Sequence, residues 1–576
     1  MPSASPIPTS SVIDGAPAAV STLLSRLSLR EAARYYAEGT WGRDTLHALL
    51  CRHAAERPDD YALRDARGRL TWRRLLTWVD TLAEHLHQAG VRRGQRVAVW
   101  LPSRAESVVT LLACARNGYV CSPSLHQNYT VAEIIQLLER SRAVALILQP
   151  GYGADAGASD VVAGAQALPC MRAVFTVPGR HGQDTRTHRY PPADAGMRPT
   201  LPADDDPDRI IYLAFTSGTS GSPKGVMHSH NTLLANGRAM VEDWRHDPRT
   251  ILLSLSPMSH HIATVAVEQT LTAGCELVVN DPPPGAQPLD WILQTEATYV
   301  MGVPTHAIDV LAEANRRGLR ALGAVRTFYM AGAPIPRELA QAFLAMGIQP
   351  QNVYGMTENG SHQYTLPSDD ATTIVETCGR AARGYETRIF SQDNRDIELA
   401  AGQVGEIGTR GALLMLGYFD DQIATEESFN RDGWFMSGDL GTLDERGCLR
   451  IVGRKKDLII RGGHNIHPAR IEDLAHRHPA VLKAAAFGVP DARLGEKVCL
   501  ALIVREGERV SAQAALEHLH AVGLAKYDMP EFFITLDAFP LTASGKILKR
   551  ELALWARSGR IQPQPVCWVE PAQREA

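Results

Sequence analysis

The chain has 576 residues, of which 45% are hydrophobic and 21% are charged, a balance typical of a globular protein with several domains. Its 59 basic and 63 acidic residues nearly cancel, leaving a formal net charge of -4. Because such a chain has no overall positive field, we exclude nucleic acid and anionic membrane surfaces as general partners and expect a small-molecule ligand.

The N-terminal residues 1–44 are expected to comprise an Ala-, Ser- and Pro-rich leader and a first helix. The leader lacks the pattern of a secretory signal, and the Arg-bearing stretch 25–36 predicts a helix docked on the domain, the alternative being part of a transit peptide. No apolar run approaches the ~18 residues of a membrane helix, and the nearest one, 108–120, is interrupted by Arg116 and Asn117. We therefore expect no integral membrane segment.

From residue 46 to residue 215, helical periods alternate with short apolar runs, which predicts a parallel sheet covered by helices. The predicted helices are Arg73–Gln88 and Ala105–Ala115, and the predicted strands are Arg96–Trp100, Val144–Leu148 and Arg209–Phe215. Residues 151–208 are rich in Gly, Ala, Pro and Asp and are predicted to be loops over a sheet edge.

After Gly402 the sequence changes to short β-prone pieces separated by Gly and Asp. These pieces are Gly405–Arg410, Trp434–Leu440 and Cys448–Gly453. We place a domain boundary at Arg454–Lys456, so that an N-terminal domain covers residues 45–455. Beyond it the pattern predicts a compact α+β domain at 456–560 and an irregular tail at 561–576. The segments of that second domain are Ile459, Arg470–Arg477, Ala484–Val489, Val498–Val504, Ala512–Val522, Phe532–Leu536 and Lys546–Ala556.

The nine cysteines are scattered and form no CxxC pair, so the sequence predicts neither a zinc ribbon nor a disulfide framework. This usage indicates a reducing compartment, and we expect a cytoplasmic protein.

The most specific local signal is a loop rich in Gly, Ser and Thr that follows the apolar strand 210–215. Its glycines let the backbone approach a polyphosphate, its hydroxyls add donors, and its lysine supplies a positive charge. The order GxxxxGK[ST] is absent, so this is not a Walker A loop, and neither a dinucleotide fingerprint nor a GxSxG elbow is present. Taken alone, the segment could also be a surface turn. The predicted phosphate-binding residues are Thr216, Ser217, Gly218, Thr219, Ser220, Gly221 and Lys224.

This loop resembles the signature loop of the adenylate-forming superfamily, and further motifs follow in the order of that family. They are Ser256–His260, Met330–Pro334, Tyr354–Glu358, Ser437–Leu440, Gly453–Asp457, Gly462–Pro468 and Pro540–Lys546. The resemblance spans about residues 45–555 and is greatest to the acid–CoA ligase branch. It implies an α/β fold with a large N-terminal domain of parallel, helix-covered sheets, a small β-barrel-like subdomain, and a small mobile α+β C-terminal domain.

The resemblance implies that ATP activates a carboxylic acid as its acyl-AMP, with release of pyrophosphate, and that CoA then takes the acyl group. Lys546 matches the catalytic lysine that bridges the carboxylate and the α-phosphate. Thr357 matches the hydroxyl beside the α-phosphate, and Glu358 matches the carboxylate that holds Mg²⁺. The alternative for Thr357 and Glu358 is a helix-capping pair.

The resemblance also assigns the rest of the nucleotide site. Asp439 matches the carboxylate that accepts both ribose hydroxyls, Arg454 supports the same sugar, and Tyr354 belongs to the neighbouring motif. The alternative for the residues around Asp439 is a plain turn. The segment expected to line the adenine is Gly332, Ala333 and Pro334.

Thioester formation requires a different geometry, which the family reaches by rotating the small domain. Lys456 occupies the hinge position. The rotation would remove Lys546 and bring Gly462 and Gly463 to the acyl site, where the absence of Cβ atoms lets pantetheine pass. A hairpin turn at these two glycines is a compatible alternative.

The acyl pocket by matching positions is mostly apolar or small and carries no fixed charge for a second carboxylate or an amine. We therefore expect an apolar monocarboxylic acid, and the chain most resembles ligases of fatty acid metabolism that act on medium-chain acids or cyclohexanecarboxylate. His260 could gate the carboxylate at the mouth of the pocket or be a core histidine. The predicted lining residues are His260, His261, Ile262, Met301, Gly332, Val353, Gly355, Gly360 and Ser361.

Three other functions remain open from the sequence. They are an adenylating enzyme that loads a carrier protein, a luciferase-like oxygenase, and a nucleotide-binding regulator without catalysis. The regulator is disfavoured because Lys546, Glu358 and Asp439 are all retained. The oligomeric state also stays open, with a homodimer among the alternatives.

Overall fold

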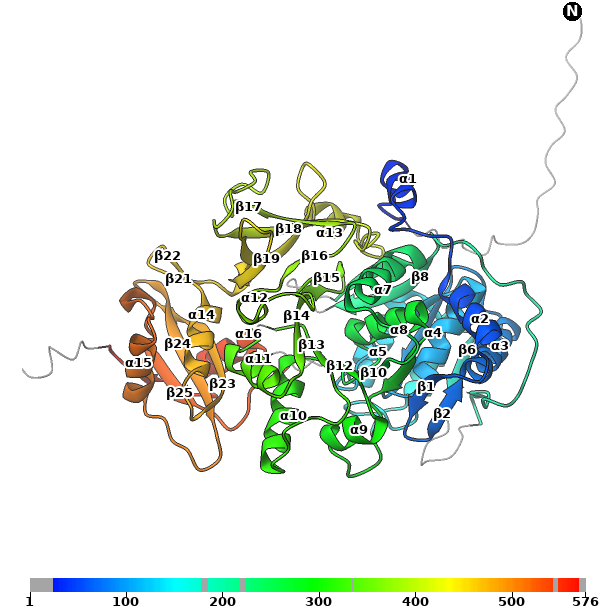
Figure 1. Cartoon of the computed structure of the whole chain (residues 1–576), viewed down its shortest axis with the longest axis horizontal. Coiled ribbons are helices and arrows are strands. Elements are labelled where there is room, and N and C mark those ends of the chain that lie inside the picture. The colour runs from blue at the N-terminus through cyan, green and yellow to red at the C-terminus, as the bar shows by residue number, and fades with distance from the viewer. Residues whose placement is uncertain (1–23, 178–184, 217–222, 334, 542–546, 569–576) are drawn as a thin grey trace, which may run out of the picture.

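The structure is a computed structural model that describes residues 24–177, 185–216, 223–333, 335–541 and 547–568. Its strands form four sheets of nine, seven, six and four strands. Figure 1 shows the two largest sheets with their helices at one end of the molecule and the six-stranded sheet at the other. The predicted α/β class with helix-covered parallel sheets is confirmed.

The seven-stranded sheet has the order β7-β6-β5-β3-β4-β8-β9 and is parallel except for the hairpin of β8 and β9. Three of its strands are predicted by apolar runs in the sequence. The expectation of loops throughout 151–208 is wrong in part, because this segment contains the helix α6 (Val161–Gln166) and two strands that extend the sheet edge. The bounds are β3 Arg96–Trp100, β4 Val120–Ser122, β5 Ala143–Leu148, β6 Ala173–Thr176, β7 His188–Arg189, β8 Ile210–Thr216 and β9 Lys224–Ser229.

The nine-stranded sheet has the order β16-β15-β14-β13-β12-β10-β11-β1-β2. Its central strands are parallel, and antiparallel strands close both ends. The bounds are β1 Tyr61–Asp65, β2 Gly68–Thr71, β10 Ile251–Ser254, β11 Glu276–Val279, β12 Tyr299–Gly302, β13 Thr327–Met330, β14 Gln349–Met356, β15 Gly360–Tyr364 and β16 Arg380–Ala381.

The helices of this part differ strongly in burial. Every residue of α4 is buried, which explains why the run 108–120 is so apolar, and α7 and α8 are buried along almost their whole length. In the part of the chain that the structure covers, no helix is both long enough and apolar enough to span a bilayer. The bounds are α2 Leu46–Glu56, α3 Trp72–Gln88, α4 Ala105–Asn117, α5 Val131–Ser141, α7 His230–Trp244, α8 His261–Ala273, α9 Pro288–Thr295, α10 Pro304–Arg316, α11 Arg337–Ala345 and α12 Ala371–Glu376.

The first helix, α1 (Leu29–Ala37), is docked on the domain as the sequence predicts. The hydroxyl of Ser28 caps it by accepting from the backbone N–H of Glu31 at 3.3 Å. Tyr35 is buried, and the Tyr36 hydroxyl donates to Asp208 Oδ2 at 3.0 Å. These contacts fix the helix on the protein surface.

The four-stranded sheet is antiparallel and has the order β17-β18-β19-β20. Its edge strands are β17 and β20, so it is an open sheet where the sequence predicts a barrel-like subdomain. The short helix α13 (Gln422–Glu427) lies between β18 and β19 in the chain. The bounds are β17 Tyr385–Phe390, β18 Gly405–Gly411, β19 Phe435–Leu443 and β20 Leu449–Arg454.

After β20 the chain passes through η1 (Lys455–Asp457) into the six-stranded sheet, and we call residues 459–568 the C-terminal unit. Whether the chain divides into domains at this point stays a prediction. The prediction of an irregular tail is wrong in part, because the last strand pairs with β25 and Trp568 packs against the core of this unit. The bounds are β21 Ile459–Arg461, β22 His464–Ile466, α14 Pro468–His476, β23 Val481–Asp491, β24 Gly495–Val504, α15 Ala512–Ala521, η2 Lys526–Asp528, β25 Phe532–Thr535, α16 Lys549–Arg557 and β26 Gln564–Pro565.

Candidate active site

The predicted phosphate loop connects the two strands of the β8–β9 hairpin. Thr216 ends β8 opposite Lys224, the first residue of β9, and its hydroxyl donates to the Lys224 carbonyl oxygen at 3.5 Å. This pairing holds both ends of the loop together. The predicted loop residues Ser217, Gly218, Thr219, Ser220 and Gly221 lie outside the described residues, as do Pro334 and the predicted catalytic Lys546.

Lys224 and Glu358 meet through Tyr418. The Lys224 Nζ lies 4.7 Å from the centre of the Tyr418 ring, and the Tyr418 hydroxyl donates to Glu358 Oε1 at 3.1 Å. Burial raises the pKa of the Glu358 carboxyl above its ordinary value, while the hydrogen bond from Tyr418 and the charge of Lys224 act to lower it. The lysine ammonium is therefore close enough to compensate part of the carboxylate charge.

Thr357 and Glu358 lie in the tight turn between β14 and β15. The side chain of Asn359 stabilises this turn by accepting from the Met356 N–H at 3.0 Å. The Thr357 carbonyl oxygen lies 2.7 Å from Nε2 of His228. Because no helix begins at Thr357, the helix-capping alternative for this pair is wrong.

Asp439 has a partner on each carboxylate oxygen. It lies opposite Arg454 on neighbouring strands, with Arg454 Nε 3.1 Å from Oδ1, and the Tyr354 hydroxyl donates to Oδ2 at 3.0 Å. The charge of Asp439 raises the pKa of Arg454 and so favours the charged guanidinium. Asp439 lies within the strand β19 rather than in a plain turn.

The nucleotide residues also converge on one another. Tyr354 of β14 binds Asp439, and Glu358 lies in the turn that directly follows β14, so the end of this strand brings the two acidic residues into one region. Gly332, which has a φ of +89°, and Ala333 follow β13 (Thr327–Met330) after one intervening residue. A left-handed φ is readily adopted only by glycine, which accounts for glycine at position 332.

The predicted acyl-site residues gather at the start of α8. His260 caps this helix, its Nδ1 accepting from the Ile262 N–H at 3.3 Å. His261 Nδ1 lies 3.2 Å from the Tyr212 hydroxyl, and its ring stacks on His228 with the ring centres 5.5 Å apart. Burial lowers the pKa of His228 to about 4 and that of His261 well below its ordinary value, so both rings are neutral near pH 7.

The other predicted lining residues come from β12, β14 and β15. The hydroxyls of Tyr329 and Ser361 lie 2.7 Å apart, and the amide side chain of Asn236 holds the Ser361 backbone at 2.9 and 3.1 Å. A Cβ atom on Gly355 would lie 1.8 Å from the carbonyl oxygen of Gly360, so that glycine serves the close packing of the hairpin. Ile262, Met301 and Val353 are buried and apolar.

The predicted hinge and pantetheine glycines lie on either side of β21. Loss of hydration, and then the charge of Arg454, lowers the pKa of Lys456 in η1. Gly462 and Gly463 form the two-residue turn between β21 and β22 with φ of +57° and +85°, which confirms the predicted hairpin.

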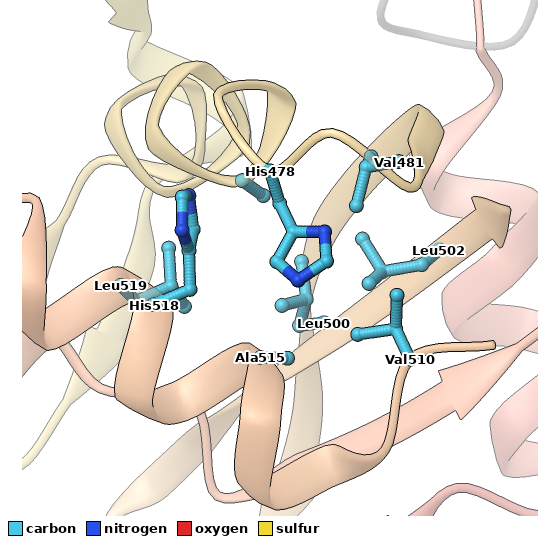
Figure 2. Close-up of a pocket in the computed structure, with 9 residues that line it drawn as sticks. His478, Val481, Leu500, Leu502, Val510, Ala515, His518 and Leu519 are labelled. Atoms are coloured by element: carbon cyan, nitrogen blue, oxygen red, sulfur yellow. The ribbon is translucent and has the colours of Figure 1, made fainter. Parts of the chain in front are cut away.

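Two features lie apart from these residues. Figure 2 shows a cavity in the core of the C-terminal unit, bordered by α15 and β24 and lined by apolar side chains with His478 and His518. It contains none of the predicted site residues. Within the described ranges, no three or more His, Cys, Asp or Glu side chains cluster as a metal site.

Several residues that contact the predicted site residues were not predicted from the sequence. Tyr418 and Tyr212 carry no sequence signal, because each contact depends on tertiary packing. Glu268 did carry a signal, since it follows His261 by seven residues and therefore shares its face of a helix. The missed contact residues are Tyr212, His228, Asn236, Glu268, Tyr329 and Tyr418.

Comparisons with known proteins give one consistent result. The model of the AMP-binding enzyme family matches residues 50–419, and the model of the AMP-binding enzyme C-terminal domain matches residues 470–546. The medium-chain fatty-acid–CoA ligase of Escherichia coli is 29% identical, covering 90% of this chain and 91% of its own length. A feruloyl-CoA synthase of Amycolatopsis is 33% identical, covering 87% and 97%. The crystal structure of ATP-bound MatB from Rhodopseudomonas palustris superposes with a TM-score of 0.78 at 28% identity, covering 90% of this chain and all of that one.

Proposed function

The chain belongs to the AMP-binding enzyme family, and on that basis we propose that it is an acid–CoA ligase that forms an acyl-AMP from ATP and then an acyl-CoA thioester. One observation carries the proposal furthest. Lys224, Glu358 and Asp439 come from three different parts of the chain and converge at the end of β14, with Tyr418 and Arg454 as their partners. Cations, carboxylates and hydroxyls so placed fit the phosphates and the sugar of a nucleotide.

The first half-reaction forms a bond between a substrate carboxylate oxygen and the α-phosphorus and breaks the bond from that phosphorus to pyrophosphate. Negative charge shifts towards the leaving pyrophosphate, so a fixed ammonium lowers the barrier. We assign Lys224 and Lys546 to these oxygens. Asp439 would accept the two ribose hydroxyls, with Arg454 and Tyr354 holding its carboxylate in place.

Magnesium fits this site through Glu358. Mg²⁺ is usually held by one or two carboxylates together with substrate phosphates, so a single buried carboxylate beside the nucleotide fits its coordination preference. The raised pKa of Glu358 reflects a negative charge that burial leaves poorly solvated, and a cation would remove that cost. When bound, Mg²⁺ would neutralise charge on the phosphates.

In the second half-reaction the CoA thiol attacks the acyl carbonyl, the thiol loses its proton, and AMP leaves with the bridging oxygen. We propose that rotation about Lys456 exchanges Lys546 for the Gly462–Gly463 turn at the acyl site. A turn without Cβ atoms leaves room for the pantetheine arm.

The acid we propose is a largely apolar monocarboxylate of the medium-chain or alicyclic class. The buried Ile262, Met301 and Val353 support it, and so do relatives named for a medium-chain fatty acid and for the aryl acid ferulate. Such an enzyme would act in fatty acid metabolism in the cytoplasm.

The test is pyrophosphate release from purified protein with ATP and Mg²⁺, using benzoate, cyclohexanecarboxylate, hexanoate, octanoate and acetate, with and without CoA. We expect acid-dependent release that turns over only with CoA and is lost in Lys546→Ala. Lys549→Ala is the matched control, because the Lys549 ammonium pairs with Glu472 at 2.7 Å and should not contribute to the chemistry. Release that is indifferent to CoA would contradict the ligase and favour a carrier protein as acceptor.

A further inference from the structure

Glu268 is a buried carboxyl group in the middle of α8, with 1% of its surface exposed. Among the residues that the structure describes, none forms a hydrogen bond with either carboxyl oxygen. Other buried acids are paired: Glu106 with Arg67 and Arg104, and Glu276 with Arg69. An unpaired buried carboxyl group lowers the stability of the fold, so its presence is explained if it forms hydrogen bonds with a bound ligand.

The side chain faces the predicted acyl site. His261, Thr264 and Glu268 are spaced i, i+3 and i+7 along α8 and therefore share one face of the helix. The Tyr212 hydroxyl lies 3.2 Å from His261 Nδ1 and accepts from the Thr264 hydroxyl at 3.1 Å. Glu268 follows Thr264 by one turn on this face, so its side chain leaves the helix on the same side as the Tyr212 hydroxyl.

A second link runs from Glu268 to the far strands of that site. Glu268 packs against Gly237 of α7, where a Cβ atom would lie 2.8 Å from the Glu268 backbone, and the neighbouring Asn236 holds the Ser361 backbone at 2.9 and 3.1 Å. The next residue of the helix, Gln269, donates to the Met301 sulfur at 3.4 Å. Three of the predicted lining residues, His261, Met301 and Ser361, are thus connected to this turn of α8.

The depth of the group follows from helix geometry. Seven residues separate His261 from Glu268, which places Glu268 roughly 10 Å further along the axis from the mouth of the site. On the other side α7 closes the space, because a Cβ atom on Gly237 would lie 2.8 Å from the Glu268 backbone. Glu268 therefore marks the end of the acyl site that is remote from the phosphates.

The chemistry of the group selects its ligand. Burial raises the pKa of Glu268 well above its ordinary value and so favours the neutral acid, which has one O–H donor and a carbonyl acceptor. A hydroxyl group complements both, since it can accept one hydrogen bond and donate one. An ammonium group would instead require the carboxyl to ionise in an apolar interior, at a large desolvation cost.

We propose that Glu268 is a specificity-determining residue that binds a hydroxyl group carried by the acid at the end remote from its carboxylate. The proposal rests on the proposed ligase function and narrows it. The preferred substrate becomes a hydroxylated medium-chain or aryl acid, in place of the wholly apolar acid that the sequence predicts.

The test compares matched acids that differ only in the terminal hydroxyl. The pairs are ω-hydroxyoctanoate with octanoate, and para-hydroxycinnamate with cinnamate, and the readout is the ratio of kcat/KM for CoA-dependent AMP formation within each pair. We expect the natural chain to prefer the hydroxylated acid of at least one pair by about tenfold or more, because rejecting it would leave Glu268 unpaired. The two pairs distinguish an alkyl from an aryl body.

Variants of Glu268 then show whether this residue causes the preference for the hydroxylated acid. Glu268→Leu should bring the ratio to one or below, and Glu268→Gln should retain more of it, because an amide still offers a donor and an acceptor. Glu276→Gln is the matched control, since it alters another buried glutamate of the same region that is already paired, and its ratio should equal that of the natural chain.

The outcomes separate the two proposals. Turnover of plain acids with no preference for a hydroxyl, or a preference that survives Glu268→Leu, would overturn the role of Glu268 and leave the ligase standing. Absence of CoA-dependent turnover with every acid would overturn both. If Glu268→Leu does not fold, the ratio of Glu268→Gln decides, and an unchanged ratio there counts against the proposal.

Discussion

The nucleotide end and the acyl end of the candidate site treat buried acids in opposite ways. At the nucleotide end both oxygens of Asp439 are occupied by Arg454 and Tyr354, and Glu358 is held by Tyr418. At the acyl end neither oxygen of Glu268 has a hydrogen-bond partner in the described part of the chain. Polar side chains that are held in place by protein partners can bind the same ligand in every cycle at low entropic cost. A buried polar side chain without protein partners can gain hydrogen bonds only from the ligand. Under the proposed function, the first end would recognise ATP and the second would choose one acid over another.

The strongest way to break this comparison is to remove the charge of Glu358. We expect Glu358→Gln to slow acid-dependent pyrophosphate release by about a hundredfold or more, because the residue proposed to hold Mg²⁺ would lose the charge that binds this cation. Tyr418→Phe removes only the hydrogen bond to this carboxylate and should have a much smaller effect. Equal losses in the two variants would mean that the orientation of the carboxylate, rather than its charge, is what matters.

A smaller loss is expected from Asp439→Ala. This change removes the proposed ribose acceptor and leaves Arg454 and Tyr354 without their partner, so KM for ATP should rise about tenfold or more, while KM for the acid changes little. Asp444→Asn is a suitable control, because Asp444 lies just after the same strand and contacts only its own turn. A rise in both KM values would contradict a role confined to the nucleotide.

Thermal stability sharpens the comparison at the acyl end. Glu268→Leu should raise the free energy of unfolding by roughly 1–2 kcal/mol, because a buried carboxyl without partners is replaced by an apolar group. Glu276→Gln should lower it by about 1 kcal/mol or less, since the paired Arg69 is partly exposed and its charge is screened. The measurement is the midpoint of the first thermal transition, and a loss of stability in Glu268→Leu would show that the carboxyl group has a structural partner.

The smallest effect is on the pH dependence of stability. A carboxyl whose pKa is raised in the folded state binds more protons there than in the unfolded chain, so stability falls as the pH rises above its ordinary pKa of 4.5. Glu268→Gln removes this contribution, and the slope between pH 5 and 7 should become less negative by at most ~1.4 kcal/mol per pH unit. Thermal midpoints across that range give the slope, and identical slopes in the two proteins would contradict the raised pKa.

The elements that could be predicted are those in which a continuous run of residues is buried. The buried central strands β3 and β8 are continuous apolar runs, so their place in parallel, covered sheets can be read directly. Short edge strands such as β6 and β26 escape prediction, because a few residues carry no period and pair only once the sheet exists.

The same contrast holds within the site. Asp439 and Arg454 belong to recognisable motifs, and the register of β19 with β20 brings them together. The contact of Tyr418 with Glu358 joins residues 60 positions apart, and no local pattern announces it. That no described residue pairs with Glu268 likewise depends on tertiary packing, although the position of Glu268 on the helix follows from its spacing to His261.

The place of Arg454 has a mechanical consequence. It is the last residue of β20, it is bound to Asp439, and the connection to the C-terminal unit begins at the next residue. If that unit rotates about Lys456, the hinge lies beside this ion pair. A ligand that binds Asp439 would therefore act on the residues next to the hinge. The coupling is reciprocal: if the ligand stabilises one orientation of the C-terminal unit by a given free energy, that orientation strengthens ligand binding by the same free energy.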